Sequence, residues 1–146
     1  MRLEATTTVP ASPEVVFDKL TDLAWIEGIL GARGVVRSQT AGTGVAAGSA
    51  WQADFTARGA QRSIRVSLSR CDAPTDIVAV GEGKLIKATV DITLSASGTG
   101  TSAQFAVEAE GFSLQGRLLV QSANLARGRI EKRFAKGVEK LGAQIA

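Results

Sequence analysis

The stretch IKATVDITL, residues 86–94, alternates strictly between apolar and polar side chains. A period of two places successive side chains on opposite faces of an extended strand. The same alternation occurs in residues 51–58, 63–69 and 103–109, and turn-forming sequence such as DAPTD at residues 72–76 separates the runs. So many consecutive alternating runs predict an antiparallel sheet with one buried face.

In the last part of the chain, the period of the apolar side chains changes from two to that of a helix. One stripe holds Leu119, Ala123, Ala126, Ile130, Phe134, Val138, Leu141 and Ile145. The opposite side holds the basic residues Arg127, Arg129, Lys132, Arg133, Lys136 and Lys140, interpreted here as a solvated outer face. The pattern predicts one long terminal helix, about 40 Å in length, whose apolar stripe covers the apolar face of the sheet.

The first thirty residues predict a strand followed by two short helices. Residues 2–9 alternate and indicate a half-buried strand. Ser12 is placed to cap a helix whose first position is Pro13. A second helix is expected over residues 23–30, ending at Gly31 or Gly34. The glycine-rich stretch of residues 40–48 lacks a phosphate-binding pattern and is interpreted as a hairpin loop.

The opening of the chain carries a resemblance to a known family. Residues 9–22, VPASPEVVFDKLTD, resemble the "vpaspeeVwdfltD" signature of bacterial START-like (SRPBCC) proteins, the superfamily that includes the birch-pollen-allergen family, and Trp25 falls where members often carry an aromatic residue. The resemblance implies an α+β helix-grip fold in which a curved antiparallel sheet of six or seven strands wraps around a long C-terminal helix. It also implies an internal cavity for lipids, sterols, polyketides or quinones. We expect residues 1–146 to form a single domain of this type.

The few aromatic residues fall on the stripes expected to face the interior. The last strand is expected to slip register near Gly111 and to continue through Phe112 and Leu114. Gly128 and Gly137 weaken the helix, which is easier to understand if space is needed there. Core packing explains each apolar side chain singly. The hypothesis of a ligand cavity assigns to its wall Trp25, Ile29, Trp51, Phe55, Phe105, Phe112, Leu114, Phe134 and Val138.

Composition excludes several kinds of chemistry. The 146 residues include no histidine, no tyrosine and a single cysteine, Cys71, so the usual general base and the usual zinc ligands are missing. We expect no metal, no cofactor, and a passive half-buried Cys71 thiol with no base to activate it. With a net charge of +3 and no long apolar run, the sequence predicts a soluble, cytoplasmic monomer or weak dimer that binds no nucleic acid.

Glu82 is the one acid considered as a catalytic candidate, and strand parity decides its position. If Val78 and Val80 face inward, Glu82 does so too and becomes a candidate acid or base with a raised pKa. If Ile77 and Ala79 face inward, Glu82 is exposed to water. We favour the second alternative because acids are rarely buried.

The leading hypothesis is binding or transport of a small hydrophobic ligand such as a lipid, quinone or polyketide-like molecule, with the second short helix and the loop of residues 42–48 at the mouth of the cavity. An alternative is a polyketide cyclase or hydrolase that uses Glu82 or Arg65. A further alternative is an assembly factor resembling a carbon monoxide dehydrogenase subunit, with the basic helix face on a partner or on an anionic membrane surface.

Overall fold

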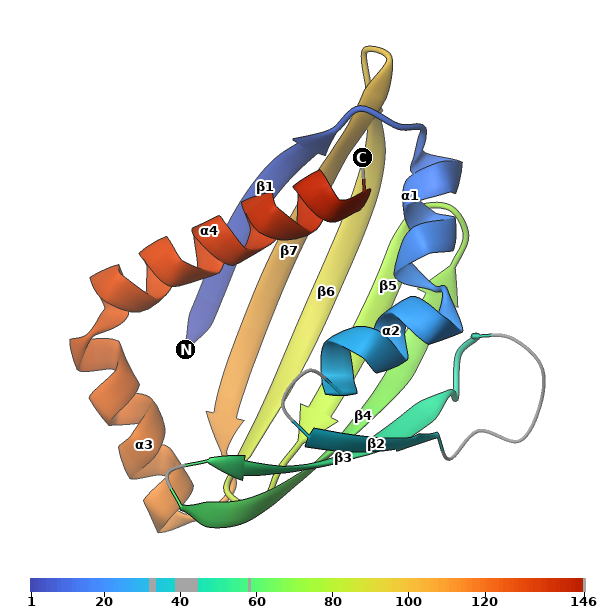
Figure 1. The fold of residues 1–146 in the computed structure, drawn as a ribbon. Helices are drawn as coiled ribbons and strands as arrows, with labels where there is room; N and C mark the ends of the chain where they lie inside the picture. Colours follow the sequence, from blue (N-terminus) through green and yellow to red (C-terminus); the bar gives the residue numbers. More distant parts are fainter. Residues whose placement is uncertain (32–33, 39–44, 58, 146) are drawn as a thin grey trace.

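Seven strands and four helices make up the part of the chain that the computed structural model describes, residues 1–31, 34–38, 45–57 and 59–145. The strands form one antiparallel sheet in the order β1-β7-β6-β5-β4-β3-β2. Figure 1 shows the helices gathered over one side of this sheet. The elements in chain order are β1 (Arg2–Val9), α1 (Pro13–Leu20), α2 (Leu23–Leu30), β2 (Gly34–Ser38), β3 (Ala50–Ala57), β4 (Ala60–Asp72), β5 (Asp76–Glu82), β6 (Ile86–Ser97), β7 (Gly100–Gly111), α3 (Leu114–Leu125) and α4 (Arg127–Ile145).

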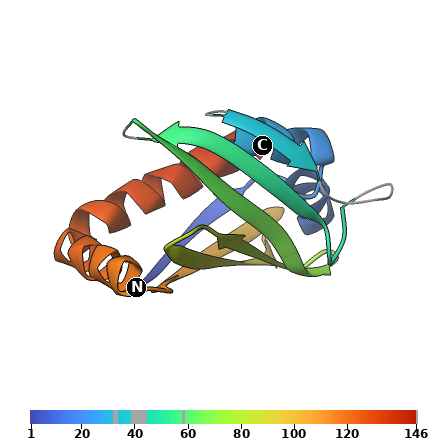
Figure 2. The same cartoon turned by 90° about the horizontal axis from the view of Figure 1, so that it is seen from below.

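The predicted alternation of the strands is confirmed by their burial. Leu94 of β6 and Phe105 of β7 are buried, whereas their polar neighbours Ser95 and Gln104 are exposed. The sheet is strongly bent, as the view in Figure 2 shows. A bent antiparallel sheet with helices on its apolar side is the predicted α+β helix-grip fold.

The first short helix begins at Pro13 and the second spans Leu23–Leu30, as the sequence predicts. The Ser12 side chain accepts a hydrogen bond of 3.3 Å from the Val15 amide, and Asp22 caps α2 in the same way with a bond of 3.0 Å from the Trp25 amide. Each cap satisfies one of the amides that a helix leaves unpaired in its first turn. These local bonds fix where α1 and α2 begin.

The predicted long C-terminal helix is confirmed as α4, but the prediction that it runs unbroken from Leu119 is wrong, because a separate helix, α3, precedes it. The helical hydrogen bonds are interrupted at Ala126, whose amide donates to the Ala123 carbonyl oxygen at 3.0 Å in a tight turn. Figure 1 shows the change of direction between α3 and α4 at this point. Because α3 packs on the end of β7 and α4 crosses to β1, one straight helix would not reach both places.

The last strand ends at Gly111, so the predicted continuation through Phe112 and Leu114 is also wrong. Ser113 caps α3, and its hydroxyl accepts a bond of 3.1 Å from the Gly116 amide. A Cβ on Gly111 would overlap the backbone nitrogen of Arg117. Gly111 therefore allows the end of the strand and the first turn of α3 to cross, and no bulge is formed.

Helix α4 lies across β1 at very short range. A Cβ on Gly142 would come within 2.9 Å of the Thr7 methyl group, so only glycine allows this approach. Val138, one turn earlier, is buried in the core. These contacts join the terminal helix to the first strand of the chain.

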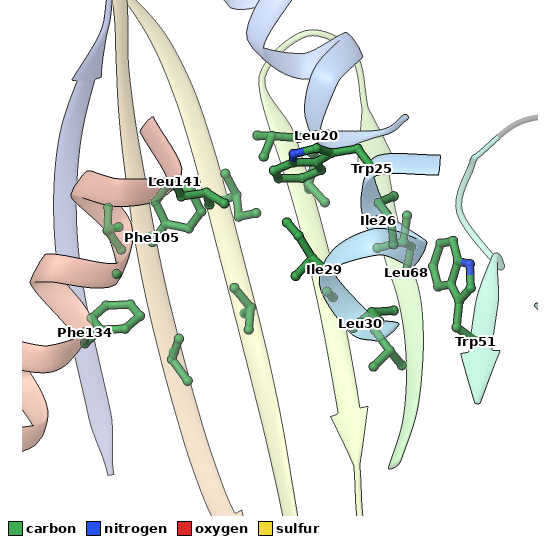
Figure 3. A pocket seen from close by; sticks show the side chains of 18 of the residues that line it. Leu20, Trp25, Ile26, Ile29, Leu30, Trp51, Leu68, Phe105, Phe134 and Leu141 are labelled. Carbon is green, nitrogen blue, oxygen red and sulfur yellow. The ribbon is translucent and has the colours of Figure 1, made fainter. Parts of the chain in front are cut away.

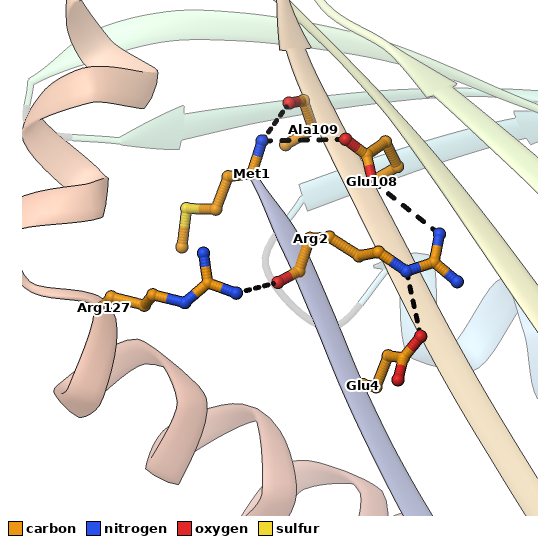
Figure 4. Close-up of polar contacts among 6 residues, drawn as sticks. All are labelled: Met1, Arg2, Glu4, Glu108, Ala109 and Arg127. Carbon is orange, nitrogen blue, oxygen red and sulfur yellow. Dashed lines mark hydrogen bonds and ion pairs between the residues drawn. The ribbon is translucent and has the colours of Figure 1, made fainter.

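Polar contacts reinforce this junction at the other end of β1 (Figure 4). The Arg127 guanidinium donates a hydrogen bond of 2.8 Å to the Arg2 carbonyl oxygen and one of 2.6 Å to the Glu131 carboxylate. Arg2 in turn pairs with Glu4 at 2.9 Å and with Glu108 at 3.8 Å. All of these side chains are exposed, and exposed ion pairs contribute little individually. The bond from Arg127 to the Arg2 carbonyl oxygen joins the first residue of α4 to the start of β1.

We expect Gly116→Ala to lower the free energy of unfolding by roughly 1–3 kcal/mol, because its Cβ would overlap the Leu85 carbonyl oxygen and backbone cannot move aside easily. Gly128→Ala is the matched control, because a Cβ there meets nothing within 4 Å. The control should raise stability by about 0.5–1 kcal/mol. Urea denaturation followed by circular dichroism measures both, and a neutral or stabilising Gly116→Ala would contradict the close packing of α3.

Candidate functional site

The helices do not fill the concave side of the sheet, and a cavity of about 630 Å³ remains. Side chains from α2 and from α4 face each other across it, as Figure 3 shows for Ile29 and Phe134. The five central strands supply the floor. The lining comprises Leu20, Trp25, Ile26, Ile29, Leu30, Trp51, Val66, Leu68, Ile77, Ala79, Val90, Ile92, Phe105, Val107, Ile130, Arg133, Phe134, Gly137, Val138 and Leu141.

The parity of β5 settles the position of Glu82. Ile77 and Ala79 face the cavity, so Glu82 points to the opposite side of the sheet and is exposed. Arg65 lies directly across from it on β4 and is exposed as well. The favoured expectation of an exposed Glu82 is confirmed, and neither residue reaches the cavity.

Six of the nine residues assigned to the cavity from the sequence line it together. They are Trp25, Ile29, Trp51, Phe105, Phe134 and Val138. Phe55 instead lines a second hollow of about 470 Å³ at the far end of the same face, beside Ile86 and Leu119.

Phe112 and Leu114 were assigned to the cavity wrongly. They are 51% and 73% exposed. Both residues follow the end of β7. The alternation of side chains between the two faces of a strand, on which their assignment rests, therefore does not extend to them.

The sequence analysis missed much of the floor and one charged residue. Alternation had already placed Val66, Leu68, Val90 and Ile92 on the apolar face, so parity alone would have found them. The exception is Arg133, which was interpreted as part of the outer face of the helix. It does lie on the exposed side of α4, yet it also borders the cavity.

The mouth of the cavity involves α2, as expected, since Ile29 lines the cavity and is 45% exposed. The other expected part of the mouth was the loop of residues 42–48. Residues 42–44 lie outside the described residues, and Gly48, which is described, does not line the cavity.

The wall of the cavity is almost wholly apolar. Arg133 is its one charged residue among the described parts of the chain. The Trp51 indole Nε1 is buried and meets no acceptor among the described residues. No acid lines the wall, so within the described sequence the cavity holds no carboxylate to act as a general acid or base.

Cys71 is half-buried beside the core, as the sequence predicts. Burial raises the pKa of the Cys71 thiol above its usual range, and the negative charge of Asp72 raises it further. A raised pKa keeps the thiol protonated near neutral pH, and the protonated thiol is a poor nucleophile.

We expect Cys71 in the folded protein to react with iodoacetamide at neutral pH more slowly than in the urea-unfolded chain. The pKa of the Cys71 thiol is higher in the folded protein than in the unfolded chain. The stability linked to this thiol is therefore fully present below the unfolded pKa and is lost as the pH rises through the folded pKa. Mass spectrometry measures the rate of labelling in the folded and in the unfolded chain, and the Cys71→Ser variant is the control without a thiol. Faster labelling of the folded form would show an activated thiol.

Two further observations concern the described residues only. No group of three or more His, Cys, Asp or Glu side chains is arranged to hold a metal ion there. No helix in the same ranges has both the length and the apolar character needed to cross a membrane.

A bent antiparallel sheet that grips a helix over an apolar cavity defines the START-like (SRPBCC) class of proteins. The chain belongs to the family described as polyketide cyclase / dehydrase and lipid transport, whose model matches residues 1–146. No curated protein matches it.

Solved structures show the same fold at low sequence identity. The Mll3558 protein from Rhizobium loti is 16% identical with a TM-score of 0.68, covering 100% of this chain and 96% of its own. The TTHA0849 protein from Thermus thermophilus is 17% identical with a TM-score of 0.65, covering 100% and 99%. Ara h 8.0201 is 15% identical with a TM-score of 0.61, covering 94% and 97%. Likeness at these identities supports the fold alone.

Proposed function

We propose that this protein binds and carries a single small hydrophobic molecule in the cavity between the sheet, α2 and α4. The observation that carries the proposal is the cavity itself, about 630 Å³ in volume and lined almost entirely by apolar side chains. Volumes of this order are typical of sites for small molecules, where buried apolar area supplies affinity and a few polar groups supply orientation.

The family supports the proposal in a general way, because its description includes lipid transport. The same description includes cyclases and dehydrases, so the family does not choose between a carrier and an enzyme. The wall of the cavity favours the carrier. A cyclase that uses Glu82 or Arg65 finds no support, because both side chains lie on the other side of the sheet. The assembly-factor alternative and a cytoplasmic location remain predictions.

The protein provides its own reporter for the test. Its two tryptophans, Trp25 and Trp51, both line the cavity. A neutral apolar probe such as Nile red should therefore bind with a change in tryptophan emission and a rise in its own fluorescence. Native mass spectrometry of protein purified without detergent should show a retained small apolar molecule. Protein that stays ligand-free and binds neither Nile red nor any member of a broad lipid panel would refute the proposal.

Gly137→Leu should fill part of the cavity and weaken Nile red binding by about tenfold or more, which corresponds to roughly 1.4 kcal/mol or more of lost binding energy. Gly137 lines the cavity, and a Cβ there meets nothing within 4 Å, so the variant should fold. Gly128→Leu is the matched control, because Gly128 lies on the same helix in equally open space but does not line the cavity. Equal binding by both variants would place the probe elsewhere.

A further inference from the structure

A cationic surface groove, formed by residues of α4 alone, adjoins the cavity. It is lined by Arg133, Lys136, Gly137, Glu139, Lys140 and Ala143. Arg133 and Gly137 line the cavity as well, so the two hollows share an edge. The apolar cavity is therefore bordered by a groove that contains three basic side chains and one acidic side chain, Glu139.

No carboxylate of the described residues forms an ion pair with these three cations. Arg2, Arg70 and Arg127 each pair with a carboxylate, whereas none of Arg133, Lys136 and Lys140 forms an ion pair with a described residue.

Helical geometry explains how one helix serves both hollows. Residues 130, 134, 138 and 141 point into the cavity at spacings of three and four, while residues 136 and 140 lie further round the helix in the groove. Residues 133 and 137 fall on the boundary between these faces. Gly137 has no side chain, so nothing at that position separates the apolar space from the groove.

On the basis of the proposed function, we propose that the ligand is an anionic amphiphile, an apolar body in the cavity with a carboxylate held by Arg133 and supported by Lys136 and Lys140. The guanidinium group matches a carboxylate with two parallel hydrogen bonds, which gives the contact both strength and direction. The apolar wall supplies affinity for the body of the ligand, and this groove selects its head group.

The test compares three probes with the same hydrocarbon chain, namely myristate, myristyl alcohol and myristyl trimethylammonium, titrated below their micelle concentrations and followed by tryptophan emission. Myristate should bind about tenfold or more tightly than the alcohol, and the cation most weakly. Arg133→Gln should reduce the preference for myristate over the alcohol to within about threefold. The matched control is Lys132→Gln, since Lys132 is equally exposed on α4 but lines neither hollow.

Each outcome bears on a different claim. Equal binding of myristate and the alcohol, or an unchanged preference in Arg133→Gln, overturns the anionic head group and leaves the hydrophobic carrier intact. If myristyl trimethylammonium binds most tightly of the three probes, the proposal of an anionic head group is overturned as well. Failure of all three probes and of Nile red removes the proposed function, and this inference with it.

A second inference rests on α3, whose outer side carries unpartnered leucines. Leu114, Leu118 and Leu125 fall on one stripe of the helix and are 73%, 52% and 92% exposed. We call these three residues the leucine face. The opposite side of the helix packs on the protein at Gly116. A Cβ at this position would overlap the Leu85 carbonyl oxygen. The leucine face is therefore turned away from the sheet.

The segment of sequence that contains the leucine face carries basic residues and no acid. Between Glu110 and Glu131 the sequence contains no acidic residue and three arginines, Arg117, Arg127 and Arg129. Arg127 is paired with Glu131, whereas Arg117 and Arg129 form no ion pair with a described residue. Exposed leucines on a helix flanked by such arginines are features of a helix that lies on an anionic bilayer surface. We infer that α3 docks on such a surface, independently of what the cavity holds.

Vesicle flotation tests this inference with phosphatidylcholine vesicles, with and without phosphatidylglycerol. The protein should float with the anionic vesicles at low salt and detach as salt rises. Replacing Leu114, Leu118 and Leu125 by serine should weaken flotation by about tenfold or more. The matched control Val15→Ser/Leu23→Ser removes two other exposed apolar side chains and should float normally.

Two results would overturn the docking of α3. One is absence of flotation by the wild type, or equal flotation by the leucine variant. The other is a dimer in analytical ultracentrifugation that the leucine variant abolishes, which would assign the leucine face to a second copy of this chain.

Discussion

The apolar side of the bent sheet has to be kept from water, and this constraint governs the rest of the molecule. Leaving apolar area exposed forfeits about 25 cal/mol for each Å², so the helices are held over that side of the sheet. They cover it at two margins. Helix α4 lies on the edge strand β1 through Gly142, and α2 contacts β2, the strand at the other edge. The middle stays open, and that opening is the cavity.

Local backbone packing decides how the margins are covered. Gly111 and Gly116 let the end of β7, the Leu85 carbonyl and the first turn of α3 come together at distances that a side chain would prevent. Because α3 is held there, the chain must turn at Ala126 before α4 can reach β1. The turn displaces the first part of the terminal helix from the cavity and leaves the leucine face without a partner in the described chain.

Charge and apolar surface are separated along α4 in a way that matters for function. Phe134 and Val138 complete the apolar wall, while the lysines of the same helix remain in water. Arg133 lies at the boundary, where a charged group can meet the end of a molecule whose body is buried. Among the described residues the wall carries no carboxylate and its edge carries cations, and the proposal of a bound anionic amphiphile rests on these two features.

The sequence by itself determined the strands, the cap at Ser12 and the apolar stripe of α4, because these depend on periodicity and on bonds between residues close in the chain. Six of the nine residues that the sequence predicts for the cavity line it in the structure. Tertiary structure alone decided the break at Ala126, the exposure of Phe112 and Leu114, and the separation of Phe55 from the cavity. It also decided that Arg133 borders the apolar space. These features depend on contacts between distant segments, such as Gly116 against Leu85, and no local period of the sequence records such contacts.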